Sequence, residues 1–162
     1  MSEREMFLAS FDREFATTLK CLKAYPADKA GFKPHPRSKT ALELAWDFVT
    51  EQQVAIAGAL AGQIDFSKTP KPPGTMQEVI AAYEKGHQET AGKVKAASDE
   101  SLNKKIKFPV GPKQMGDLRV MDVCWGVMQD QIHHRGQFSV YLRMAGGKVP
   151  SIYGPSADEP WM

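Results

Sequence analysis

The chain has 162 residues and a mass of 17.9 kDa, enough for one domain with a continuous core and too little for two of ordinary size. Hydrophobic residues make up 42% and charged residues 25%, which are globular averages that argue against disorder and against a membrane protein. The net charge is only +2 and the lysines are scattered, so we expect no nucleic-acid-binding face. We therefore expect a single domain over residues 1–162.

The cysteines and the N-terminal residues indicate in which cellular compartment the protein is expected. Cys21 and Cys124 are the only cysteines, and their wide separation suits neither a disulfide framework nor a zinc-binding pair. The first twelve residues include Glu3, Glu5 and Asp12 and so do not resemble an export signal. No apolar run is long enough to span a bilayer. We expect a cytoplasmic protein with reduced thiols and no membrane partner.

The prolines predict where helices can form, because proline inside a helix removes a hydrogen bond and clashes with the preceding turn. None of the 11 prolines falls within four long windows, namely 1–25, 37–69, 74–108 and 113–149. Each window has room for about six turns at about 3.6 residues per turn. Four long helices are therefore predicted.

Apolar residues recur every three or four positions in each window, as on one face of a helix. Capping and helix-stopping residues indicate the ends of these helices. The predicted helices begin at Ser2, at Ser38 or Thr40, at Gly74 or Thr75 and at about Leu118, and the last three end at about Gly62, Ala97 and Ala145.

Four amphipathic helices of similar length bury their apolar faces best against one another, which predicts an all-α four-helix bundle. The connecting segments 25–37, 63–74 and 98–117 are longer than minimal helix–helix loops, so at least one crossover is expected. The last of them is expected to contain a short hairpin, because Lys104–Val110 is the one segment with a strand-like pattern. The proline-containing tail Lys148–Met162 is expected to be extended and to pack over an end of the bundle.

Two ionisable residues lie on the apolar face of the last helix. At about 100° per residue, Asp130 and His134 align with Val123 and Val127, one turn apart. Because burying such groups is costly without a partner, they suggest a site. A carboxylate and an imidazole at this spacing can bind one cation. The alternative is a buried ion pair in which Asp130 holds a protonated His134.

Two other helices could supply a third inward polar group. Asp47 lies at the edge of the apolar stripe of the second helix, and Glu51, one turn later, lies closer to its apolar side. The alternative for Asp47 is a solvated carboxylate on the helix flank. On the third helix, His87 faces inward, and its alternative is a hydrogen-bonded core histidine.

Three segments resemble the DinB-like family. Residues 130–137, Asp-Gln-Ile-His-His-Arg-Gly-Gln, followed by Tyr-Leu-Arg at 141–143, resemble the signature of its fourth helix. Residues 40–47 are similar to its early metal-ligand helix, and residues 149–159 resemble its tail. The resemblance covers essentially the whole chain. It implies up-down-down-up connectivity, a homodimer, and one divalent metal near a cavity between helices.

The resemblance also implies which residues bind the metal. In that family three histidines usually do so, one from the second helix and two a turn apart on the fourth. The matching positions are Asp47, Asp130 and His134, of which only His134 keeps the family's residue. Two carboxylates and one imidazole form a harder ligand set, which favours iron, manganese or nickel over zinc. The alternative is a decayed site in which the two aspartates share His134 or take up a proton.

The family includes enzymes that use low-molecular-weight thiols, such as mycothiol-dependent isomerases and bacillithiol transferases. The resemblance implies a metal-dependent thiol S-transferase, or a related hydrolase or isomerase, in which the metal activates a bound thiol or water. Glu51, His87, Gln137 and Tyr141 are expected beside the metal or in the cavity wall. The alternative is a non-enzymatic dimeric bundle that binds a ligand or responds to stress, with a vestigial metal site. The substrate is not predicted.

Overall fold

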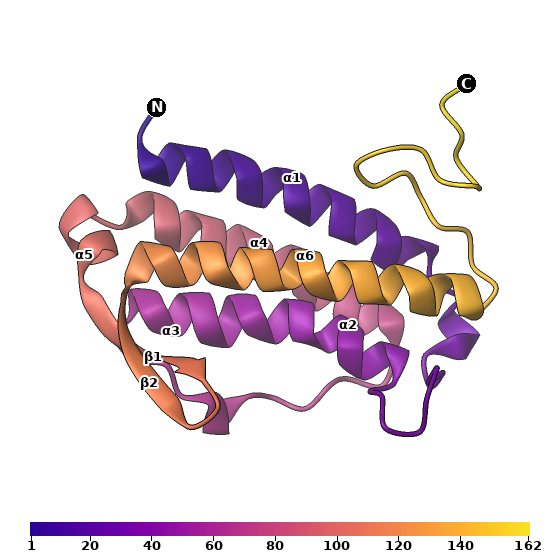
Figure 1. The fold of residues 1–162 in the computed structure, drawn as a ribbon, viewed down its shortest axis with the longest axis horizontal. Coiled ribbons are helices and arrows are strands. Elements are labelled where there is room, and N and C mark those ends of the chain that lie inside the picture. Colours follow the sequence, from indigo (N-terminus) through magenta and orange to yellow (C-terminus); the bar gives the residue numbers. More distant parts are fainter.

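The computed structural model describes residues 1–162 and shows four long helical rods packed as a bundle (Figure 1). The second rod is continuous but includes a π-helical segment, η2, between two α-helical parts. None of the helices is both long and apolar enough to cross a membrane. The four predicted helices are confirmed as α1 Glu3–Ala24, the second rod (α2 Ala41–Thr50, η2 Glu51–Ile56 and α3 Ala57–Leu60), α4 Met76–Ala96 and α6 Val120–Met144.

Three rods begin with the same cap. A Ser or Thr hydroxyl accepts a hydrogen bond from the backbone N–H of a glutamate three residues later, and the glutamate carboxylate accepts one from the N–H of the capping residue. These pairs are Ser2–Glu5, Thr40–Glu43 and Thr75–Glu78. The last rod, α6, stops just before Gly146, whose positive φ of 84° suits glycine.

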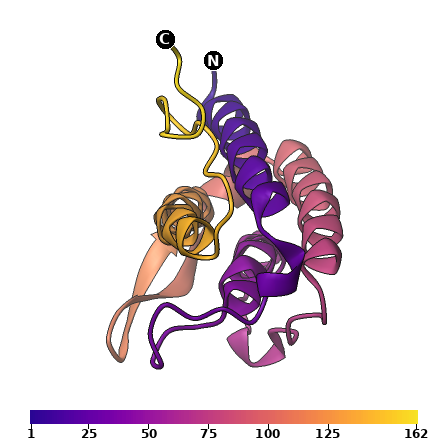
Figure 2. The same cartoon turned by 90° about the vertical axis from the view of Figure 1, so that its right-hand side faces the viewer.

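The rods follow the expected up-down-down-up connectivity. In Figure 1, α1 and α6 run in one direction, whereas α2 and α4 run in the other. The segment between Leu60 and Met76 returns along the bundle, so that α4 runs parallel to α2 (Figure 1). Helix α2 packs against α6, and α1 packs against α4 and α6. Figure 2 shows this arrangement in a view along the bundle. The two helices with the predicted ligands are therefore direct neighbours.

The connection between α4 and α6 contains the short helix α5, Asp99–Asn103, and the expected hairpin. Strand β1, Lys105–Gly111, pairs antiparallel with β2, Gln114–Arg119. The turn between them places Lys113 at φ 57°. Strand β2 leads directly into α6, and the hairpin lies at the same end of the bundle as α5 (Figure 1).

The core has two hydrophobic clusters with polar side chains between them. Along α6, the buried apolar residues between 120 and 128 belong to one cluster, and those between 138 and 142 belong to the other. Gln131 and Arg135 lie between these stretches, and Gln52 takes the corresponding place in the second rod. All three are at most 3% exposed. The middle of the bundle is therefore polar, at the level where the candidate site lies.

The tail was expected over an end of the bundle, but its Tyr153 reaches back along the sides of α1 and α6. The guanidinium of Arg135 lies 2.7 Å from Oε2 of Glu14 on α1, and it donates a hydrogen bond to the hydroxyl of Tyr153 in the tail. That hydroxyl donates in turn to Oε2 of Glu14 at 2.7 Å. Further along, Arg143 on α6 pairs with Asp158 at 2.6 Å. The tail is thus attached to the bundle by a buried contact and a half-exposed one.

Candidate functional site

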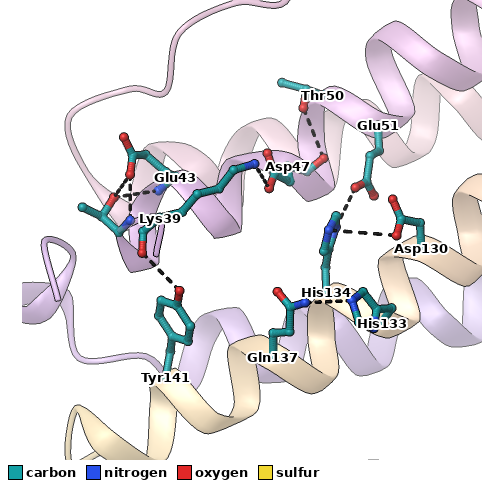
Figure 3. Close-up of polar contacts among 11 residues, drawn as sticks. Lys39, Glu43, Asp47, Thr50, Glu51, Asp130, His133, His134, Gln137 and Tyr141 are labelled. Carbon is teal, nitrogen blue, oxygen red and sulfur yellow. Dashed lines mark hydrogen bonds and ion pairs between the residues drawn. The ribbon is translucent and has the colours of Figure 1, made fainter. Parts of the chain in front are cut away.

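The second rod and α6 bring one imidazole and two carboxylates together (Figure 3). Ligand atoms of Glu51, Asp130 and His134 all lie within 4.8 Å of one another. Nδ1 of His134 is 2.7 Å from Oε1 of Glu51, and Nε2 of His134 is 4.0 Å from Oδ1 of Asp130. We call these three residues the triad. Its nitrogen and oxygen atoms are ligand types that divalent transition metals accept.

The backbone of the second rod places Glu51 over α6. Glu51 is the first residue of η2, and at the end of this segment the N–H of Ala57 reaches back to the carbonyl of Gln52, the spacing of a π-turn. Such turns are rare in helices and frequent at functional sites. The buried amide of Gln131 donates to the carbonyl of Phe48 at 3.1 Å. This bond joins the second rod, shortly before η2 begins, to the residue of α6 that follows Asp130.

One buried oxygen of the triad lacks a hydrogen-bond partner. The side chains of Glu51 and His134 are only 15% and 20% exposed. Oε2 of Glu51 is buried with no partner. The other oxygen of this carboxylate, Oε1, faces Nδ1 of His134 at 2.7 Å. Unpaired buried polar atoms are unfavourable, and a cation that accepts their lone pairs would satisfy them. The residues present therefore fit a divalent metal.

Burial and charge alter the protonation of the triad. Burial raises the pKa of Glu51 to about 7, although His134 acts in the opposite direction. Contact with Glu51 raises the pKa of His134 above its usual value, against the effect of burial. The negative charges of Asp130 and Asp47 contribute to both increases. Near neutral pH, Glu51 and His134 therefore behave as a coupled pair that holds a proton.

Asp47, the predicted ligand on the second helix, is not part of the triad. Its Oδ2 lies 2.5 Å from Nζ of Lys39, with which it forms an ion pair. Figure 3 shows Asp47 one turn before Glu51 on the same rod. Glu51, which lies nearer the apolar side of the helix, is the carboxylate of this rod that faces His134. The prediction that Asp130 and His134 lie together agrees with the geometry.

His87, expected beside the metal, lies elsewhere in the core. Its Nε2 is 2.8 Å from Oδ1 of Asp12, and its ring stacks on Phe15 at 3.9 Å between centroids. Both partners belong to α1, so His87 faces α1 rather than the triad. Burial lowers the pKa of His87. His87 is therefore a hydrogen-bonded core histidine, which was the alternative to a place beside the metal.

Gln137 and Tyr141, the expected cavity-wall residues, also have other partners. The amide nitrogen of Gln137 lies 2.7 Å from Nε2 of His133, on the exposed side of α6. The hydroxyl of Tyr141 donates to the carbonyl of Lys39 at 3.1 Å (Figure 3). Tyr141 thereby fixes the backbone of Lys39, whose ammonium pairs with Asp47. Neither residue forms a hydrogen bond with the triad.

Comparison with known proteins gives consistent matches along the chain. The sequence profile of the DinB family matches residues 1–161. An uncharacterised Bacillus subtilis protein, YrdA, is 29% identical over 162 residues, covering 94% of this chain and 89% of its own. The crystal structure of a DinB-like protein from Bacillus cereus superposes with a TM-score of 0.77 at 24% identity, covering 92% of this chain and 97% of that one. A DinB-like protein of Bacillus subtilis, YjoA, superposes with a TM-score of 0.73 at 18% identity, covering 90% and 96%.

Proposed function

The chain belongs to the DinB family, and from this membership and the geometry of the triad we propose that it is a divalent-metal-dependent enzyme. The observation that carries the proposal is a buried carboxylate oxygen without a hydrogen-bond partner, Oε2 of Glu51, beside the imidazole of His134. Both residues belong to a group whose ligand atoms lie within 4.8 Å of one another. Two carboxylates and one imidazole favour iron, manganese or nickel, with zinc as a further candidate.

The residues of the triad have different parts in this proposal. Glu51 and His134 are largely buried and held by packing, so they fix the position of the ion. Asp130 is 57% exposed and lies on the side open to solvent. Three protein ligands leave coordination positions for other molecules. When bound, a divalent metal supplies Lewis acidity that lowers the pKa of a coordinated thiol or water.

The finer proposal is a transferase that uses a low-molecular-weight thiol. The chain's own thiols are unsuited to nucleophilic chemistry, because burial raises the pKa of Cys21 to about 11 and that of Cys124 to about 12. Both cysteines are fully buried. A thiol that reacts at this site would therefore have to come from a small molecule. This argument supports the resemblance to thiol-dependent members of the family.

A non-enzymatic role is the second proposal, and one observation favours it. Both ring nitrogens of His134 face a carboxylate, Glu51 on one side and Asp130 on the other. A protonated imidazole would be compatible with both carboxylates, without a metal. In that case the triad would be a buried ionic cluster in a ligand-binding or stress-response bundle. The homodimer implied by the family resemblance stays a prediction in either case.

Elemental analysis separates the two proposals. The chain should be purified without metal-affinity chromatography and then incubated with manganese, iron, nickel or zinc before unbound ions are removed. We expect about one ion per chain, a stoichiometry that Glu51→Ala and His134→Ala abolish. Asp47→Ala serves as the matched control and should retain the ion. A parent protein that binds none of these ions would refute the metal-dependent enzyme.

A screen with cellular thiols then tests the finer proposal. The metal-loaded protein should consume an electrophilic co-substrate only in the presence of one of these thiols. His134→Ala should lose this turnover together with the metal. Turnover that does not depend on any added thiol would instead indicate a hydrolase.

A further inference from the structure

A groove lies next to the triad, between α6 and the β-hairpin. Its volume is about 450 Å³, within the range of small-molecule sites in proteins. Most of its lining residues come from one face of α6, and the other wall comes from strand β1. The groove is lined by Phe108, Gly126, Val127, Gln129, Asp130 and His133.

Asp130 connects the groove to the triad, because it belongs to both. The side chain of Asp130 is 57% exposed, whereas those of Glu51 and His134 are 15% and 20% exposed. The triad is therefore more open on the side of Asp130. Figure 3 shows Asp130 and His133 on the same stretch of α6, with Asp130 turned towards Glu51. A molecule in this groove can approach the triad past Asp130.

The wall opposite α6 is apolar. Phe108 on β1 is partly buried and packs against the core cluster near the hairpin. Phe66, which is 50% exposed, lies edge-on to Phe108 with their ring centroids 6.5 Å apart. On the α6 side of the groove, Val127 is a further apolar lining residue. This surface suits a compact aliphatic or aromatic group.

The floor of the groove is open at Gly126. No atom lies within 4 Å of the position that a Cβ would take there. Glycine inside a helix is less stable than alanine by roughly 0.5–1 kcal/mol, so local helix stability does not account for it. Gln129 and His133, one and two turns further along α6, supply polar side chains at the same groove. The groove thus combines an apolar wall, an open floor and hydrogen-bonding groups.

We propose that this groove binds the organic part of the substrate, a small thiol with a compact apolar body. In this arrangement the sulfur lies at the triad and the apolar body lies against Phe108 and Val127. Gln129 and His133 contact polar substituents. The inference rests on the proposed function, because the triad must hold a metal for the sulfur to be bound there.

Cobalt provides a direct readout of thiol binding, because a thiolate that coordinates Co²⁺ gives a charge-transfer absorption. The cobalt-loaded protein should be titrated with benzyl mercaptan and with 2-mercaptoethanol. We expect benzyl mercaptan to bind about tenfold more tightly or better, since its ring loses water-exposed apolar surface in the groove. Equal affinity for the two thiols would overturn the groove proposal.

Two glycines of α6 offer matched variants. Gly126→Leu fills the groove and should remove the preference for benzyl mercaptan, with unchanged cobalt affinity and unchanged 2-mercaptoethanol binding. Gly136→Leu is the control, because Gly136 is also exposed and has no atom within 4 Å of its Cβ position, but lies outside the groove. Gly126→Ala adds one carbon and should keep most of the preference.

The possible outcomes distinguish the groove proposal from the proposed metal site. If cobalt binds and Gly126→Leu behaves like Gly136→Leu, the groove proposal is wrong and the metal site stands. If the parent binds no cobalt, the proposed function and the role of the groove fail together. A loss of cobalt from Gly126→Leu alone would also overturn the groove proposal, because the side chain would then act on the triad itself.

Discussion

Metal binding at the triad is predicted to release about one proton at pH 7. Burial raises the pKa of Glu51 to about 7, and contact with Glu51 raises the pKa of His134. The two side chains approach within 2.7 Å, so they share about one proton near neutral pH, whichever of them holds it. A metal needs both residues deprotonated as ligands and therefore displaces this proton.

The size of the effect follows from the number of protons displaced. With one proton released per ion, the apparent affinity falls about tenfold for each pH unit below 7. The fall becomes steeper at lower pH, where the pair takes up its second proton. Isothermal titration calorimetry with Mn²⁺ at pH 7, in buffers of different ionisation enthalpy, gives the proton number directly.

A conservative variant locates the proton. Glu51→Gln keeps the shape of the side chain but removes the titrating carboxylate, which is also the main cause of the raised pKa of His134. Proton release at pH 7 should therefore drop well below one, and the affinity should be weaker and depend less on pH. An affinity for Mn²⁺ that is constant between pH 6 and 8 would refute this reasoning. Equal proton release from the parent and from Glu51→Gln would refute it as well.

Three further predictions concern the core around the triad. Arg135→Met should lower the free energy of unfolding by about 3–5 kcal/mol, because it removes the cation paired with the largely buried carboxylate of Glu14. Arg143→Met, which breaks a half-exposed ion pair with the same tail, should cost much less. Urea denaturation compares the two, and equal losses would contradict the prediction. Because burial lowers the pKa of His87, its stabilising contribution is present above the unfolded pKa of about 6.5 and is lost as pH falls through the lower folded value. His87→Leu should therefore lose less stability than the parent between pH 7 and 5, and an equal loss would count against the argument. Gln131→Leu should cost about 1–3 kcal/mol in the same assay, because it removes the buried hydrogen bond to the carbonyl of Phe48, and a loss below about 0.5 kcal/mol would contradict this.

The helices could be predicted because their signals are local. Proline positions and apolar periodicity each depend on a few neighbouring residues and agree along all four rods, and capping residues agree with them at the start of three rods. The π-helical segment Glu51–Ile56 has no such signal. Its residues are compatible with an ordinary α-helix, and a π-turn depends on how the rod packs against its neighbours. That information is not contained in any short stretch of sequence.

The site was predictable to the extent that periodicity determines which residues face the core. This reasoning placed Asp130 and His134 together and placed Glu51 nearer the apolar side than Asp47. It could not place Lys39, which lies before the second rod and pairs with Asp47 from there. Periodicity shows that a residue faces inward but not which neighbouring helix it meets. For this reason His87 was expected near the triad, although it faces α1.

Arg135 links the position of the tail to the geometry of the triad, because it lies beside His134 on α6. Arg135 follows His134 directly, so their side chains leave α6 about 100° apart. His134 faces Glu51 on the second rod, whereas Arg135 is 1% exposed and faces Glu14 on α1 and Tyr153 in the tail. A rotation of α6 about its axis would break both sets of contacts at once. The buried guanidinium therefore restricts the orientation in which His134 meets Glu51, and the tail contributes to that restriction through the hydroxyl of Tyr153.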